Sequence, residues 1–362
     1  MAVFRLATGT IARLTKQRRG PSVRLLLAPM EGVADFVLRD VLTAIGGYDL
    51  AVSEFVRVSG TLLPRRMFER ICPEILTGGR TAAGTPVAVQ LLGSDPDLLA
   101  GNAARLAALS PHGIDLNFGC PAKVVNRHGG GAMLLDRPRL LHDIAAAVRA
   151  AVPADVPVTA KMRLGIADPS QAIDCAQALA EGGAQAIVVH ARTRDQGYRA
   201  PAHWEWVARI GDAVRVPVTA NGEVWGVPDW ARCRAVSAAE DVMIGRGAVS
   251  DPWLARRIRG ERAPEPDEHD WVELHPHILR YWEGVQARAA PVHACGRLKL
   301  WLGMLRRHYP AAGRLHEAVR RVVHPARMNE ELRRHGIPAR DHPPATAVDA
   351  PRQTCTTTCP DR

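Results

Sequence analysis

The chain alternates between short apolar runs and longer segments in which apolar residues recur at helical spacing. Ala-, Leu- and Arg-rich stretches such as 97–109, 138–151, 171–182 and 227–237 predict amphipathic helices. Runs rich in β-branched residues predict strands near 24–28, 49–55, 86–92, 113–118, 156–163, 185–191, 215–220 and 240–245. Alternating strands and helices favour parallel pairing through right-handed crossovers. Eight such units over about 250 residues predict a (β/α)8 TIM barrel.

The pattern changes after residue 250. Residues 261–275 are acidic and Pro-rich, so they predict a linker that leads into a helix. Residues 276–335 contain no strand-like run and predict a small all-α unit of three or four helices. We therefore expect four parts: a disordered basic arm at 1–22, a cofactor-binding barrel at 23–260, a helical domain at 261–340 and a disordered tail at 341–362.

Composition narrows the class of protein. A chain of 362 residues with 47% hydrophobic content can bury a large core. No apolar run approaches the ~18 residues that span a bilayer. The seven cysteines show no paired spacing, which favours a reducing compartment. We expect a cytoplasmic monomer with no membrane span and no bound metal.

The net charge of +10 is unevenly distributed. Residues 276–340 hold twelve Arg and one Lys against four Glu, and residues 1–20 hold five basic residues and no acid. The rest of the chain is slightly negative. A near-neutral barrel joined to a strongly basic segment predicts a polyanionic partner. A solvated surface in an Arg-rich chain is the alternative interpretation.

The stretch 113–121 carries the strongest chemical signal. A short apolar run ends at Asn117, and Cys120 follows three residues later between a Gly and a Pro. Such a run delivers an amide and a thiol to the rim of a barrel, where the chain then turns sharply. A buried structural thiol is the alternative, because a free Cys often behaves as a small hydrophobic residue. We predict that Cys120 is a proton donor.

The ends of other strands predict a flat, anionic cofactor. Met30 offers a soft, polarisable platform for an aromatic ring. Gln90 can both donate to and accept from the edge of a flavin or pyrimidine. Lys161 and Arg163 stand two residues apart on one strand face, and buried like charges need an anionic partner. A reduced flavin would supply that charge.

Glycine turns follow the last two predicted strands, around Gly222 and Gly245, and Arg246 comes next. In TIM barrels the loops after strands seven and eight often hold a phosphate. Arg246 would add a charge-assisted bond to that phosphate. His190 shares the sixth strand end with Arg192. Together these features predict FMN as the cofactor.

The chain resembles the tRNA-dihydrouridine synthase family over roughly residues 24–325. The resemblance rests on APMEG (28–32), VQLLG (89–93), DLNFGCP (115–121), KMRLG (161–165), HART (190–193), QGY (196–198), ANGE (220–223) and IGRGA (244–248). EFVRV (54–58), LLP (62–64) and HACGRLKLWL (293–302) look most like the C-type branch, which is associated with position 16 of the D-loop.

This resemblance implies an FMN-bearing TIM barrel followed by a helical tRNA-binding domain. It implies reduction of uridine to 5,6-dihydrouridine with NADPH, a hydride passing from flavin N5 to C6 and a proton from Cys120 to C5. The implied FMN-binding residues are Pro29, Met30, Glu31, Gln90, Lys161, His190, Asn221, Gly222, Glu223, Gly245 and Arg246. The implied substrate and tRNA contacts are Arg57, Asn117, Arg163, Tyr198, Arg297, Lys299 and Arg320.

Two positions depart from the family pattern. Ala191 replaces the second residue of the usual HGRT, and Met304 stands where a Tyr is expected. The Gly-rich loop 127–132 is a candidate lid that brings Cys120 into position.

Two alternative functions remain open at this point. The first is an FMN-dependent dihydroorotate or dihydropyrimidine dehydrogenase that acts on a free base. The basic helical segment argues against it, because a small substrate needs no such cationic surface. The second is an RNA-binding protein without catalysis, and Cys120, Lys161 and the glycine turns argue against that.

Overall fold

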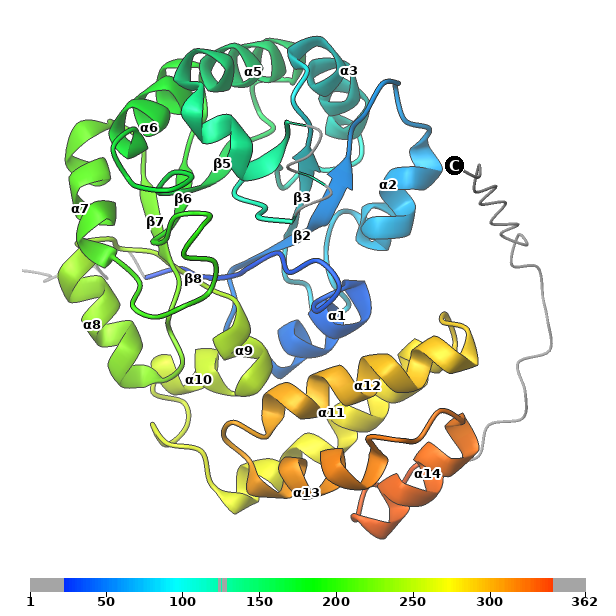
Figure 1. Ribbon diagram of the computed structural model, residues 1–362. Helices are drawn as coiled ribbons and strands as arrows, with labels where there is room; N and C mark the ends of the chain where they lie inside the picture. The colour runs from blue at the N-terminus through cyan, green and yellow to red at the C-terminus, as the bar shows by residue number, and fades with distance from the viewer. Residues whose placement is uncertain (1–22, 123–124, 126–128, 341–362) are drawn as a thin grey trace, which may run out of the picture.

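The predicted strands form a closed barrel of eight parallel strands in chain order (Figure 1). The computed structural model describes residues 23–122, 125 and 129–340. The predicted arm at 1–22 and tail at 341–362 lie outside the described residues. The strands are β1 (Leu25–Leu27), β2 (Leu50–Arg57), β3 (Val87–Leu92), β4 (Ile114–Phe118), β5 (Val158–Arg163), β6 (Ile187–His190), β7 (Val218–Asn221) and β8 (Val242–Ile244). The barrel closes where β1 pairs with β8. The prediction of a TIM barrel is confirmed.

The strands are buried on both faces, which explains their nearly continuous apolar sequences. Their outward side chains join the main core beneath the surrounding helices. Their inward side chains form a small separate cluster of Leu26, Ala28, Val52, Ala88, Val188 and Met243. Inward positions nearer the carboxyl ends of the strands are polar. The barrel interior therefore consists of an apolar layer and, nearer the carboxyl ends of the strands, a polar layer.

Helices surround the barrel, as the spacing of apolar residues predicts (Figure 1). The helix α3 shows how local sequence sets their starts: Asp95 accepts from the N–H of Leu98 at 2.9 Å, and Pro96 occupies the first turn. The barrel helices are α1 (Phe36–Ile45), α2 (Arg65–Ile71), α3 (Pro96–Ala107), α5 (Pro138–Ala151), α6 (Ala172–Glu181), α7 (Trp204–Ala213), α8 (Val227–Ser237), α9 (Arg246–Ser250) and α10 (Leu254–Ile258). Two 3-10 segments are η1 (Pro73–Thr77) and η2 (Gly131–Asp136).

The chain continues after α10 into an all-α unit. Its helices are α11 (Glu268–Gln286), α12 (Pro291–Leu305), α13 (Pro310–Val319) and α14 (Pro325–Arg334). The linker is shorter than the predicted range of 261–275, because α11 already begins at Glu268. Asp267 and Asp270 form a reciprocal capping box at its start. These acidic residues, read from sequence as part of a linker, are helix-start residues.

The helical unit packs against α1 and α9 (Figure 1). Trp301 of α12 donates from Nε1 to the carbonyl of Val249 in α9 at 3.1 Å. Tyr309 donates from its hydroxyl to Oδ1 of Asp251 at 2.7 Å. Arg257 lies buried between Asp251 and Asp270, and so joins α10 to the start of α11. The helical unit is thus bonded to the segment that follows β8.

None of the helices described between residues 23 and 340 has both the length and the apolar character needed to cross a bilayer. Within the same described residues, no cluster of three His, Cys, Asp or Glu side chains is arranged to hold a metal ion.

Candidate active site

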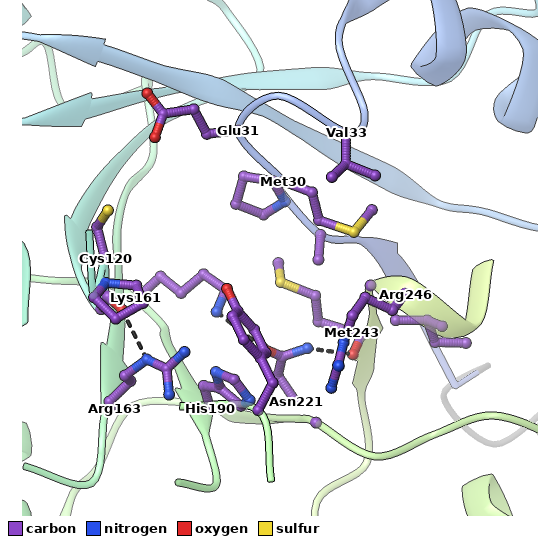
Figure 2. A pocket seen from close by; sticks show the side chains of 18 of the residues that line it. Met30, Glu31, Val33, Cys120, Lys161, Arg163, His190, Asn221, Met243 and Arg246 are labelled. Atoms are coloured by element: carbon purple, nitrogen blue, oxygen red, sulfur yellow. Dashed lines mark hydrogen bonds between the residues drawn. The ribbon is translucent and has the colours of Figure 1, made fainter. Parts of the chain in front are cut away.

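A pocket of about 480 Å³ opens at the carboxyl ends of the strands (Figure 2). Parallel strands bring their carboxyl ends to one rim, so residues distant in sequence meet there. All predicted FMN-binding residues line this pocket. Cys120, Asn117, Arg163 and Tyr198 line it as well, whereas the predicted tRNA contacts Arg57, Arg297, Lys299 and Arg320 lie outside it.

Cys120 follows β4 and is 9% exposed. It packs against Phe55, Leu92 and Val125, and this burial raises the pKa of the thiol above its ordinary value. The carboxylate of Glu31 raises that pKa further. The thiol is therefore protonated at neutral pH, as a proton donor must be.

The backbone of Cys120 is held from both sides. Its N–H donates to Oδ1 of Asn117 at 3.0 Å, and its carbonyl accepts from the N–H of Ala132 at 3.1 Å. Gly131 has a φ of +62°, and a Cβ there would lie 2.7 Å from the Cys120 carbonyl oxygen. Only glycine permits this approach. Part of the predicted lid at 127–132 lies outside the described residues, so its movement stays a prediction.

Lys161 is a half-buried cation that lines the pocket (Figure 2). Its Nζ donates to Oδ1 of Asn221 at 2.9 Å, and Nδ2 of Asn221 donates to the carbonyl of Met243 at 2.8 Å. Burial, with a contribution from the charge of Arg163, lowers the pKa of Lys161 to about 8. An anionic ligand beside Nζ would offset this loss of hydration.

Arg163 donates to three backbone carbonyls, and its guanidinium carbon lies 5.2 Å from the ring centroid of Tyr198. Its Nε donates to Gly119 at 2.8 Å, and its Nη1 donates to Thr193 at 3.0 Å and to Gly197 at 2.8 Å. On sequence alone, Lys161 and Arg163 are both cations that need an anionic partner. The structure separates them, because three carbonyl dipoles already surround the guanidinium. Its predicted contact with the substrate stays a prediction.

His190 is buried beside these cations. Burial, and then the charges of Arg163 and Lys161, lower the pKa of His190 well below its ordinary value, so the ring is neutral. Gly222 has a φ of +116°, and a Cβ there would lie 2.9 Å from Cδ2 of His190. The glycine after β7 therefore lets the backbone approach the imidazole.

Arg246 lies across the pocket from Cys120 (Figure 2). Its guanidinium carbon is 4.6 Å from the ring centroid of Tyr198 and 4.9 Å from that of Trp225. Within the part of the chain that the structure describes, no carboxylate pairs with Arg246. Glu223 instead pairs with the buried Arg192 and accepts from Nε1 of Trp225 at 2.9 Å. The pocket thus has a protonated thiol on one side and an available guanidinium on the other.

The predicted tRNA contacts have intramolecular partners. Arg297 pairs with Asp35 of the barrel. The Nζ of Lys299 donates to the carbonyls of Val322 and Arg320 at 3.0 and 3.3 Å. The Arg320 side chain is 52% exposed and pairs with Glu317 at 3.0 Å. Arg297 therefore joins the helical unit to the barrel, and Lys299 joins two segments of the helical unit. Their contacts with RNA stay predictions, as does that of Arg57 at the end of β2.

Sequence reasoning missed several residues of the pocket. Phe55, Trp225 and Met243 line it, and buried Asp115 is paired in register with Gln90 and accepts a hydrogen bond from it. Strand alternation could have found Asp115, because it stands two residues before Asn117 and must face the same way. A second groove of about 640 Å³ runs between the barrel and the helical unit. It shares Trp225 and Arg246 with the first pocket. Its other lining residues are Ser250, Gly303, Met304, Arg306, Arg307 and Gly313.

The barrel, its thiol and its cationic pocket are features of an enzyme active site, and comparison with known proteins identifies the family. The family model described as dihydrouridine synthase matches residues 26–333. The chain is 68% identical over 299 residues to the tRNA-dihydrouridine(16) synthase of Ralstonia nicotianae, covering 83% of this chain and 92% of the relative. It is 66% identical over 299 residues to the protein of that name from Cupriavidus necator, covering 83% and 93%.

The chain belongs to the dihydrouridine synthase family. The resemblance inferred from sequence is confirmed, and so is its classification as an enzyme. Among solved structures, a 2-naphthoyl-CoA reductase complex superposes with a TM-score of 0.51 at 13% identity, covering 66% of this chain and 50% of that one. That likeness concerns the barrel fold alone.

Proposed function

We propose that this protein reduces a uridine in the D-loop of tRNA, at position 16, to 5,6-dihydrouridine. FMN would be bound in the barrel pocket, and NADPH would supply the electrons. The two relatives named above carry the position in their names. The family match favours this activity over the alternative dehydrogenase acting on a free base.

The pocket residues fit FMN by their chemistry. Lys161 is a desolvated cation, and Arg246 has no carboxylate partner among the described residues. Gly245 lies next to Met30: a Cβ at that glycine would make an ordinary contact of 3.5 Å with the sulfur. Lys161 and Asn221 would bind the ring system, and Gly222, Gly245 and Arg246 would hold the phosphate. When bound, the flavin supplies the hydride that reduces C6 of the pyrimidine.

The observation that carries the proposal is the protonated thiol of Cys120 at the rim of a cationic pocket. Saturating a C5–C6 double bond requires a proton as well as a hydride. Burial keeps the Cys120 proton in place until the base arrives, and the nearby charges of Arg57 and Arg163 favour the thiolate left behind. Cys120 would therefore donate its proton to C5 of the uracil.

RNA would reach this thiol along the groove between the barrel and the helical unit. Arg306 and Arg307 line that groove and are exposed, and the guanidinium carbon of Arg307 lies 4.0 Å from the ring centroid of Trp225. The target base must leave its stack to enter the pocket, at a cost of a few kcal/mol. Contacts between phosphates and arginines would offset that cost and make binding depend on salt. The helical unit would thus serve as the tRNA-binding domain, and a monomer in the cytoplasm stays our expectation.

A direct test uses purified protein, FMN, NADPH and unmodified tRNA transcripts. Mass spectrometry of nuclease fragments should find dihydrouridine at position 16, and a transcript with cytidine at that position should gain none. A transcript modified only at another D-loop uridine would overturn the position. No dihydrouridine at any position, with flavin bound and tRNA intact, would overturn the activity. NADH in place of NADPH tests the donor.

A further inference from the structure

The amide of Asn117 belongs to a longer chain of hydrogen bonds inside the barrel. Gln90, Asp115 and Thr159 lie in register on the neighbouring strands β3, β4 and β5. Nδ2 of Asn117 donates to Oε1 of Gln90 at 2.6 Å. Nε2 of Gln90 donates to Oδ2 of Asp115 at 2.6 Å, and the Thr159 hydroxyl donates to Oδ1 of Asp115 at 2.6 Å. The chain runs from the backbone of Cys120 down to Asp115.

The direction of this chain is set at its upper end. The backbone N–H groups of Gly119 and Cys120 can only donate, and both point at Oδ1 of Asn117, at 2.9 and 3.0 Å. The NH2 group of Asn117 must therefore face Gln90. Gln90 must accept with its oxygen, so its own NH2 group faces Asp115. Each NH2 group in the chain requires an acceptor on the next residue, and the last acceptor is the Asp115 carboxylate.

Burial makes this requirement strict. Gln90 and Asp115 are 0% and 1% exposed, so water does not replace a lost partner. Without an acceptor at position 115, one N–H of Gln90 would be unpaired in the barrel interior. If the Gln90 amide rotated instead, its NH2 group would face that of Asn117. Either outcome weakens the hold of Asn117 on the Cys120 backbone.

We propose that Asp115 is a positioning residue that fixes the amide orientations of Gln90 and Asn117 and thereby holds Cys120 at the pocket rim. This inference rests on the proposed role of Cys120 as the proton donor. It also limits what Asn117 offers a ligand. Both lone pairs of its oxygen accept backbone N–H groups, and one of its two N–H bonds goes to Gln90. Asn117 therefore meets a base or flavin as a donor only, and so selects a carbonyl oxygen.

Three substitutions test the role of Asp115. Asp115→Leu removes the acceptor and keeps the same number and branching of side-chain heavy atoms. Asp115→Asn keeps an acceptor for Gln90 and turns its NH2 group toward the Thr159 oxygen, so it preserves the chain while removing the charge. Thr159→Val removes the other partner of Asp115 and leaves the chain to Cys120 intact. The measurements are the rate at which iodoacetamide alkylates Cys120, located by peptide mass spectrometry, and kcat and KM for tRNA.

We expect Asp115→Leu to raise the alkylation rate about tenfold and to lower kcat by a similar factor, with KM for tRNA little changed, since losing one buried hydrogen bond is worth roughly one factor of ten. Asp115→Asn and Thr159→Val should stay within about threefold of the unaltered protein on both measurements. An unchanged Asp115→Leu protein overturns the proposal. So does an Asp115→Asn protein as impaired as Asp115→Leu, because the charge rather than the acceptor would then be responsible.

A measurement on the unaltered protein covers the case in which Asp115→Leu does not fold. The Cys120 backbone amide and the Asn117 and Gln90 side-chain amides should exchange slowly with deuterated water. Fast exchange at Cys120 and Gln90 overturns the proposal. Alkylation and exchange need neither tRNA nor NADPH. If alkylation and exchange give the expected results but the protein reduces no uridine, the proposed function is rejected and the positioning role of Asp115 is retained.

Discussion

The Nε of Arg163 donates to the carbonyl of Gly119 over 2.8 Å, and so ties β5 to the residue that precedes Cys120. The same guanidinium donates to the carbonyl of Gly197, the residue that precedes Tyr198. One side chain therefore links the two loops that carry the predicted proton donor and the predicted contact with the base. This arrangement depends on the forked geometry of arginine, which a lysine cannot reproduce.

Replacing Arg163 by Lys should lower kcat by about tenfold or more while FMN stays bound, because one ammonium cannot hold two loops at once. Uridine reduction and the flavin absorbance of the purified protein are the measurements. Arg194→Lys on the neighbouring loop is the control and should be nearly neutral. Full activity of Arg163→Lys would show that the charge alone suffices.

Replacing Cys120 by Ala should reduce turnover by a factor of about 10² to 10⁴, the usual range for loss of a general acid. FMN content and tRNA affinity should remain near those of the unaltered protein, because the thiol contributes to neither. Cys175→Ala controls for loss of a buried thiol away from the pocket. A Cys120→Ala protein with normal turnover would mean that another group donates the proton.

The affinity of the flavin-free protein for FMN should fall as pH rises through about 8, the pKa of Lys161. The pKa of this lysine is lowered, so its charge is present below that value and lost above it. An anionic ligand binds the charged form and draws the pKa upward. Fluorescence titration with FMN between about pH 6.5 and about pH 9 measures the change. Lys161→Met should bind weakly without this dependence, and a matching decline in that variant would assign the titration to another group.

Gly131→Ala should impair turnover far more than Gly129→Ala. Both glycines have positive φ, +62° and +68°, so alanine adds similar backbone strain at each. Only at Gly131 does the new Cβ meet the Cys120 carbonyl, at 2.7 Å, whereas among the described residues no atom lies within 4 Å of a Cβ at Gly129. Turnover and melting temperature of the two variants are compared directly. Equal losses would show that strain, and not displacement of Cys120, is responsible.

Asp251→Asn should lower the free energy of unfolding by about 3 kcal/mol, because it removes a buried charge partner of Arg257. Asp251 also accepts from the hydroxyl of Tyr309, so the change weakens two contacts at once. Glu330→Gln is the control. It breaks an exposed pair with Arg327 and should cost under about 1 kcal/mol. Denaturant titration followed by circular dichroism measures both, and similar values would mean that the buried network contributes little.

The sequence predicted the barrel well because strands buried on both faces leave continuous apolar runs separated by helical periods. The pocket residues followed from the same logic, since strand ends share one rim. The start of α11 was missed because acidic residues serve equally as helix caps and as linker residues. The carbonyl partners of Arg163 could not be foreseen, because backbone acceptors have no sequence signature. The Asp35–Arg297 pair depends on how the helical unit packs on the barrel, which no local pattern specifies.

The short helix α9 begins at Arg246 in the pocket, and within the same helix Val249 accepts the indole N–H of Trp301. Arg246 of the pocket and Trp301 of the helical unit are thus connected through one short helix. We expect a barrel severed after residue 260 to lose its hold on Arg246 as well as its basic surface. A change in how the helical unit packs on the barrel should likewise shift Arg246, the residue that we propose holds the FMN phosphate. We therefore expect α9 to couple the interface between the barrel and the helical unit to the position of Arg246.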